Sequence, residues 1–128
     1  MEQERIIQAA RIEQIARQLE YNLQLIDAEI AELGDFKNNL NFLAESKEKE
    51  MLSSLGKRVF IKTKIEDRDK LFIEVGAGVV VRKSPAESLK IVEKQISRLK
   101  EAGLQIASQL NRYRGQLDEF LREIEAGD

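Results

Sequence analysis

The chain has 128 residues, enough for one domain, and it contains neither Cys nor His. It therefore lacks a disulfide framework, a cysteine nucleophile, the commonest general base and the commonest zinc ligand. Its 21 basic and 23 acidic side chains leave a net charge of −2, which argues against a dedicated nucleic-acid binder. Its apolar runs fall far short of the ~20 residues of a membrane span, and its first residues are unlike a signal peptide. We therefore expect a cytoplasmic protein with no cofactor, metal ion, nucleic-acid partner or membrane contact.

Composition and charge divide the chain into three parts. Aromatic residues are few (five Phe, two Tyr, no Trp) and there is one Pro, which is typical of long helices. Residues 1–46 have a net charge of −5, residues 47–83 of +4 and residues 84–128 of −1. The outer parts have the periodicity of helices and the middle part that of strands. The parts of this single expected domain are residues 1–48, 49–83 and 84–128.

The first part has an apolar seam. At alternating steps of three and four residues, ten of eleven positions are apolar, which predicts one side of a coiled coil. These positions are Ala9, Ile12, Ala16, Leu19, Leu23, Ile26, Ile30, Leu33, Lys37, Leu40 and Ala44. Gly34 costs about 1 kcal/mol relative to Ala in a helix. We expect the helix to continue through it, because Leu40 and Ala44 keep the phase.

The third part begins with a helix start and continues with a second seam. Ser84 can cap the helix, Pro85 suits the first helical position and Glu87 can complete a capping box. Ten of the eleven seam positions that follow are apolar. They are Leu89, Val92, Ile96, Leu99, Gly103, Ile106, Leu110, Tyr113, Leu117, Phe120 and Ile124.

The two seams have equal length and can pair antiparallel within one chain. This pairing places Ala44 opposite Leu89, and it places bulky Ile30 opposite Gly103, where a missing side chain leaves room. The alternative is a parallel dimer of two chains.

The middle part changes to a period of two residues, which predicts strands with one buried face. Residues 59–65 and 71–75 alternate, residues 79–81 resume a strand after a Gly-Ala-Gly bend, and residues 51–55 are a possible first strand. The sequence thus predicts a mostly α fold with a small β part: two long helices in an antiparallel coiled coil, joined by two β-hairpins. Hairpins on a thin stalk cannot bury both faces unaided, so we expect contacts with other subunits. The residues predicted at this interface are Val59, Ile61, Ile65, Leu71, Ile73, Val75, Val79 and Val81.

No catalytic constellation is present, and we predict that the protein is not an enzyme. The serines have no imidazole to activate them, and the Gly-Ala-Gly segment lacks the other residues of a phosphate loop. A basic cluster could attract phosphate, although charges that protect the edges of a hairpin are the favoured interpretation. Its members are Lys57, Arg58, Lys62 and Lys64.

The order of these motifs resembles the alpha-class subunit of the prefoldin family over essentially the whole chain. The most specific part is Val75-Gly76-Ala77-Gly78, which leads through Val79-Val80-Val81 into Lys83-Ser84 at the start of the second helix. Two hairpins rather than one also resemble the alpha class. One departure is Ser53-Ser54 before Leu55-Gly56, where the family often has Val-Pro.

The resemblance implies a subunit of an ATP-independent molecular chaperone. In the family, two alpha and four beta subunits form a hexamer, and their hairpins assemble into a β-barrel body. Coiled-coil arms hold non-native polypeptides at their ends and deliver them to a group II chaperonin. Alternatives are a filament-forming relative of the alpha class, or a structural coiled-coil tether or adaptor.

The ends of the two expected helices are the candidate client-binding site. Ile6 and Ile7 lie beyond the last seam layer, and Ile7, Ala10 and Leu121 point away from the seam. Such side chains can equally be ordinary surface residues or caps of the coil. The candidate client-binding residues are Ile6, Ile7, Ala10, Phe120, Leu121 and Ile124.

Overall fold

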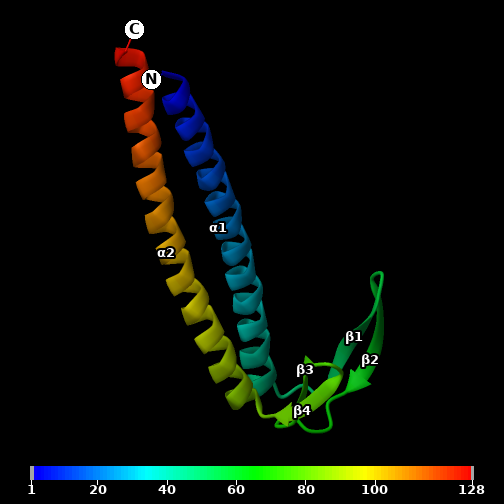
Figure 1. Ribbon diagram of the computed structural model, residues 1–128. Coiled ribbons are helices and arrows are strands. Elements are labelled where there is room, and N and C mark those ends of the chain that lie inside the picture. Colours follow the sequence, from blue (N-terminus) through cyan, green and yellow to red (C-terminus); the bar gives the residue numbers. More distant parts are fainter. Residues whose placement is uncertain (1, 128) are drawn as a thin grey trace. The chain divides into compact units, whose positions relative to one another are not determined.

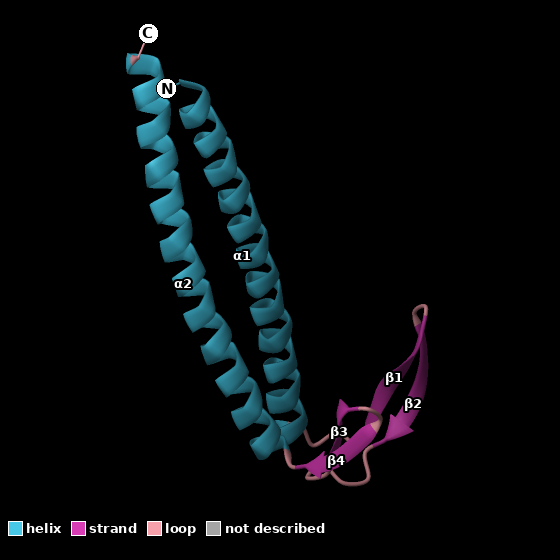
Figure 2. Ribbon diagram, in the orientation of Figure 1, coloured by secondary structure: helices cyan, strands magenta, loops and turns pink. Residues whose placement is uncertain are grey.

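The computed structural model of the protein describes residues 2–127, apart from the side chain of Val75. Two long helices enclose four strands in the sequence, and the strands form two antiparallel hairpins (Figure 2). The elements are α1 (Glu2–Glu45), β1 (Glu50–Gly56), β2 (Val59–Lys64), β3 (Leu71–Gly76), β4 (Val79–Lys83) and α2 (Pro85–Ala126) (Figure 1). The predicted fold class is therefore confirmed, including the first short strand.

The chain folds as two compact units. One combines the part of α1 up to Glu32 with the part of α2 from Ile96 onward, and the other comprises Leu33–Gln95, which holds both hairpins. Neither of the two helices in residues 2–127 has a stretch long and apolar enough to cross a lipid bilayer.

The first unit is an antiparallel pair of helices packed along the predicted seams. Ala9, Ala16 and Leu110 are buried, and the other apolar seam residues of this unit are half-buried. Two ion pairs join the helices within the chain, Arg5 to Glu123 at 3.8 Å and Arg114 to Glu20. The two helices of one chain therefore bury the seam against each other, and a parallel dimer of two chains is not needed to cover it.

The pairing at the glycine of the seam differs from the expected one. A Cβ placed on Gly103 would lie 3.6 Å from Ile26 Cγ2 and 3.7 Å from Leu23 Cδ1. Ile30 is not within 4 Å of that position, so the expected Ile30–Gly103 layer is wrong by about one helical turn. A heptad pattern sets the spacing between layers but not which layer of one helix meets which layer of the other.

The second unit contains the last turns of α1 and the first turns of α2. Leu40 and Val92 are buried, and Lys37, the polar exception of the first seam, pairs with Glu93 at 3.5 Å. Ala44 is exposed, so the expected Ala44–Leu89 layer is wrong. The last turn of α1 instead directs Leu43 toward the strands, where its larger side chain lines an apolar hollow.

The predicted start of the second helix and the continuity of the first helix are confirmed. The backbone N–H of Glu87 donates a hydrogen bond to Ser84 Oγ at 3.1 Å, and Pro85 is the first residue of α2. Ser84 is therefore an N-cap, a contribution of about 1 kcal/mol. Helix α1 runs through Gly34 without interruption.

Each hairpin closes through a tight turn with a bulge beside it. In the first, Ser54 pairs with Phe60 and Gly56 with Val59, and the register shifts between Ser54 and Gly56. A hydrogen bond of 2.9 Å joins Ser53 Oγ to Thr63 Oγ1 across the strands. In the second hairpin the register shifts in the same way between Glu74 and Gly76.

Candidate functional site

The predicted interface residues other than Val75 lie on one face of each hairpin. Directly paired residues point to the same face, and side chains alternate between faces along a strand. Ile73 pairs with Val81 on this face of the second hairpin. Val59, Ile61 and Val79 are about half exposed. Ile65, Leu71, Ile73 and Val81 are half-buried, and the side chain of Val75 lies outside the described residues.

The opposite faces of the hairpins also expose apolar side chains, which the sequence reasoning missed. Alternation assigned these positions to the polar, solvent side of each strand. Phe72 is 70% exposed and pairs with Arg82, and Leu52 is 64% exposed and pairs with Lys62. Phe60 and Val80 are also exposed on these faces. The sequence did indicate this, because Phe60 and Phe72 place a large apolar side chain on a face that was expected to meet only water.

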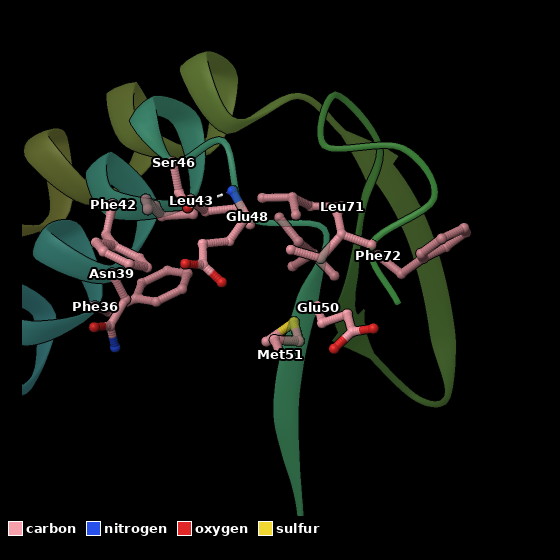
Figure 3. A pocket seen from close by; sticks show the side chains of 13 residues that line it. Phe36, Asn39, Phe42, Leu43, Ser46, Glu48, Glu50, Met51, Leu71 and Phe72 are labelled. Carbon is pink, nitrogen blue, oxygen red and sulfur yellow. Dashed lines mark hydrogen bonds between the residues drawn. The ribbon is translucent and has the colours of Figure 1, made fainter. Parts of the chain in front are cut away.

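An apolar hollow of about 450 Å³ lies between the end of α1 and the strands of the same unit (Figure 3). Phe36, Leu40 and Leu43 line it from α1. From the strands and the residues beside them it is lined by Met51, Ile65, Leu71, Phe72 and Ile73. Glu48 and Glu50 are also among the lining residues, and the carboxylate of Glu50 pairs with Lys62 at 3.2 Å. Its volume and its mostly apolar lining are those of a site that accepts apolar groups.

A second hollow, of about 420 Å³, lies between helix α2 and strands β3 and β4. Ser88 lines it and is almost fully buried, and its Oγ has no hydrogen-bond partner among the described residues. A buried hydroxyl without a partner lowers the stability of the fold by about 1–3 kcal/mol.

The candidate client-binding residues gather at one end of the first unit, where the beginning of α1 and the end of α2 meet (Figure 1). Ile6, Ile7, Ala10 and Leu121 are exposed. Phe120 and Ile124 are half-buried in the seam.

Exposed apolar residues are not confined to that end of the coil. Leu25 and Leu104 lie elsewhere in the same unit, and Leu104 is 73% exposed. Replacing Leu25 and Leu104 therefore serves as a control for replacing the exposed apolar residues at the end of the coil.

The fold defines a coiled-coil protein that carries two β-hairpins between its helices. A family model, Prefoldin subunit, matches residues 12–126, and the chain therefore belongs to the prefoldin subunit family. Prefoldin subunit alpha 2 of Thermococcus kodakarensis is 32% identical over 87 residues, which are 67% of this chain and 61% of that protein. Prefoldin subunit alpha of Methanoregula boonei is 23% identical over 88 residues, 69% of this chain and 58% of that protein. The chain thus spans about three fifths of the length of these curated relatives.

A solved structure has the same fold. The cryo-electron microscopy structure of filamentous PFD from Methanocaldococcus jannaschii matches with a TM-score of 0.74 and 21% identity. The match covers 94% of this chain and 98% of that one.

Proposed function

We propose that the chain is a subunit of an ATP-independent molecular chaperone and assembles with other prefoldin-type subunits through its hairpins. The observation that carries this proposal is the exposure of apolar side chains on both faces of the first hairpin, such as Ile61 at 50% and Leu52 at 64%. A two-stranded hairpin is only marginally stable in water. Burying each such side chain against another subunit contributes about 1.5–3 kcal/mol.

The proposed partners are beta-type prefoldin subunits, in a hexamer of two alpha and four beta chains. Two hairpins in one chain and the alpha-subunit names of the relatives support the alpha role. We further propose that the complex holds non-native polypeptides in the cytoplasm and delivers them to a group II chaperonin. The protein then acts by binding and release, and not as an enzyme.

The proposed client-binding site is the end of the coil in the first unit. Ile7 and Leu121 are each about half exposed there, on helices that end close together. One such patch binds an exposed hydrophobic segment weakly. Several arms that act on one client raise the overall affinity through effective concentration.

The test uses the chain in complex with a purified beta-type prefoldin subunit. The variant Ile7→Asp/Leu121→Asp removes apolar surface at the end of the coil. The control Leu25→Asp/Leu104→Asp removes apolar side chains that are 52% and 73% exposed elsewhere in the same unit, against 55% and 47% for Ile7 and Leu121. Native mass reports assembly, and light scattering by a chemically unfolded client reports protection from aggregation.

We expect both variants to keep the native mass and only the first to lose protection. Full protection by the Ile7→Asp/Leu121→Asp complex would refute the assignment of the client site. A complex that assembles but never protects a client would identify a structural tether. A chain that forms long polymers alone and ignores the beta subunit would identify a filament-forming relative.

A further inference from the structure

The side of α1 that points away from α2 lacks the charges of an ordinary surface helix. Where a seam steps by four residues, the residue midway between two seam positions lies on the opposite side of the helix. In the first unit the midway residues of α2 are a mixture that suits water: Glu101, Ser108, Gly115 and Arg122. Those of α1 are all uncharged: Ile7, Gln14, Tyr21 and Ala28. The two helices share one coil, so the difference concerns what lies outside α1.

The uncharged surface continues along six turns of α1. We call it the outer stripe, and its residues are Ile7, Ala10, Gln14, Gln18, Tyr21, Leu25 and Ala28. All seven are exposed, and the three largest apolar side chains, Ile7, Tyr21 and Leu25, are 55%, 56% and 52% exposed. The stripe is about 32 Å long at ~1.5 Å per residue. A helix with apolar residues on two opposite sides is typical of one that packs against two neighbours, and α2 is only the first of them.

Large and small residues in the outer stripe are arranged so that it fits a reversed copy of itself. Two stripes that run antiparallel about a twofold axis near Gln18 bring each large aliphatic side chain against an alanine. They also bring an amide against a phenol, whose hydroxyl can donate a hydrogen bond to the amide oxygen. The facing pairs are Ile7–Ala28, Ala10–Leu25 and Gln14–Tyr21, each of which occurs twice in the twofold contact.

A parallel pairing of two stripes fits less well. It would place Ala10 against Ala10 and Ala28 against Ala28, which leaves gaps, and it would crowd Tyr21 against Tyr21. A client of variable sequence gives no reason for an order of sizes that is complementary to itself. This order therefore favours a second copy of the chain as the neighbour of the stripe.

We propose that the outer stripe of α1 packs antiparallel against the outer stripe of a second copy of this chain. Each copy contributes one helix, so the contact belongs to the small and reversible class. It goes beyond the proposed function, because neither the hairpins nor a client takes part in it. It also explains why α1, unlike α2, carries no charge along its outermost positions.

The first test is disulfide cross-linking of the purified full-length chain, which has no Cys of its own. An equimolar mixture of Gln14→Cys and Tyr21→Cys should form a covalent dimer on mild oxidation, because the two positions face each other. Each variant alone should cross-link at least tenfold more slowly, since its two thiols are then about 10 Å apart along the helices. The matched control is a mixture of Ser108→Cys and Gly115→Cys, which have the same spacing on the outer side of α2.

Non-reducing electrophoresis over a range of chain concentrations separates the outcomes. Cross-linking of each variant with itself as fast as in the mixture would indicate a parallel or random contact and overturn the proposal. A control mixture that cross-links as fast as the α1 mixture would also overturn it. So would the absence of covalent dimer from the Gln14→Cys and Tyr21→Cys mixture at every concentration.

The second test measures association between complexes of the chain with a beta-type prefoldin subunit. Tyr21→Lys/Leu25→Lys places charges in the outer stripe, and Gln105→Lys/Ser108→Lys places the same charges on the exposed side of α2. In sedimentation velocity at increasing concentration, we expect the first variant to weaken association by about tenfold or more and the second to leave it unchanged. Circular dichroism checks that both variants keep their helix content.

This test is separate from that of the client site. Native mass and client protection are measured in dilute solution, where the complexes are apart, so either assignment can fail without the other. Association of the Tyr21→Lys/Leu25→Lys complex that equals wild type would overturn the proposal. If this variant instead loses client protection while association is unchanged, the stripe binds the client and not a second copy.

Discussion

Replacing Gly103 with Ala tests how closely the two helices approach. A Cβ at this position would meet Ile26 Cγ2 at 3.6 Å and Leu23 Cδ1 at 3.7 Å, which is ordinary van der Waals contact. Gly in a helix interior is about 0.8–1.0 kcal/mol less favourable than Ala. A buried methyl group contributes about a further 0.8 kcal/mol. Gly103→Ala should therefore raise the free energy of unfolding by about 1.5–2 kcal/mol.

Gly115→Ala is the matched control. Gly115 lies in the same helix, is exposed, and a Cβ there would meet nothing within 4 Å, so only the propensity gain of about 1 kcal/mol is expected. Urea titrations followed by far-UV circular dichroism measure both variants at one chain concentration, because association shifts apparent stability. A Gly103→Ala chain that is less stable than wild type, or gains no more than the control, would refute this spacing of the helices.

Four further predictions concern particular contacts. Ile26→Cys/Gly103→Cys should form a disulfide within one chain under mild oxidation, whereas Ile30→Cys/Gly103→Cys should not. Non-reducing electrophoresis distinguishes the two variants. The opposite result would support the Ile30–Gly103 layer instead. Ile61→Asp or Ile73→Asp should lower the native mass of the assembly while circular dichroism shows unchanged helix content, and an unchanged mass would contradict the interface. Ser88→Ala should stabilise the chain by about 1 kcal/mol, because it removes a buried hydroxyl without a partner. Ser84→Ala should destabilise it by a similar amount, because it removes the N-cap. A denaturant midpoint that falls for Ser88→Ala would refute the first assignment, and one that does not fall for Ser84→Ala would refute the second.

The features predicted correctly from the sequence depend on residues close together in the chain. The seams follow from spacing along one helix, the N-cap from Ser84 and the Pro that follows it, and the strands from alternation over a few residues. The segment from Val75 to Ser84 is specific enough to indicate the family from the sequence alone. Local periodicity determines these features because each is stabilised by contacts within a few residues.

The roles of the surfaces are a different matter. The roles of the candidate client-binding residues and of the predicted interface residues remain predictions. The structure shows most of these residues exposed or half-buried in the single chain. Sequence reasoning assigned one face of each hairpin to water, but Phe60 and Phe72 expose their rings there. Exposure depends on what covers a side chain, and alternation alone does not contain that information.

The sequence by itself determined that this protein has two long helices with matched apolar seams and two hairpins between them. Tertiary structure decided which residues of the two helices meet. Gly103 faces Ile26 and Leu23, and in the last turn of α1 it is Leu43, rather than Ala44, that packs toward the strands. It also decided that a hollow forms between α1 and the strands. The physical reason is that a heptad repeat permits several registers with the same spacing. Side-chain shape and the contacts at the ends of the helices select one of them.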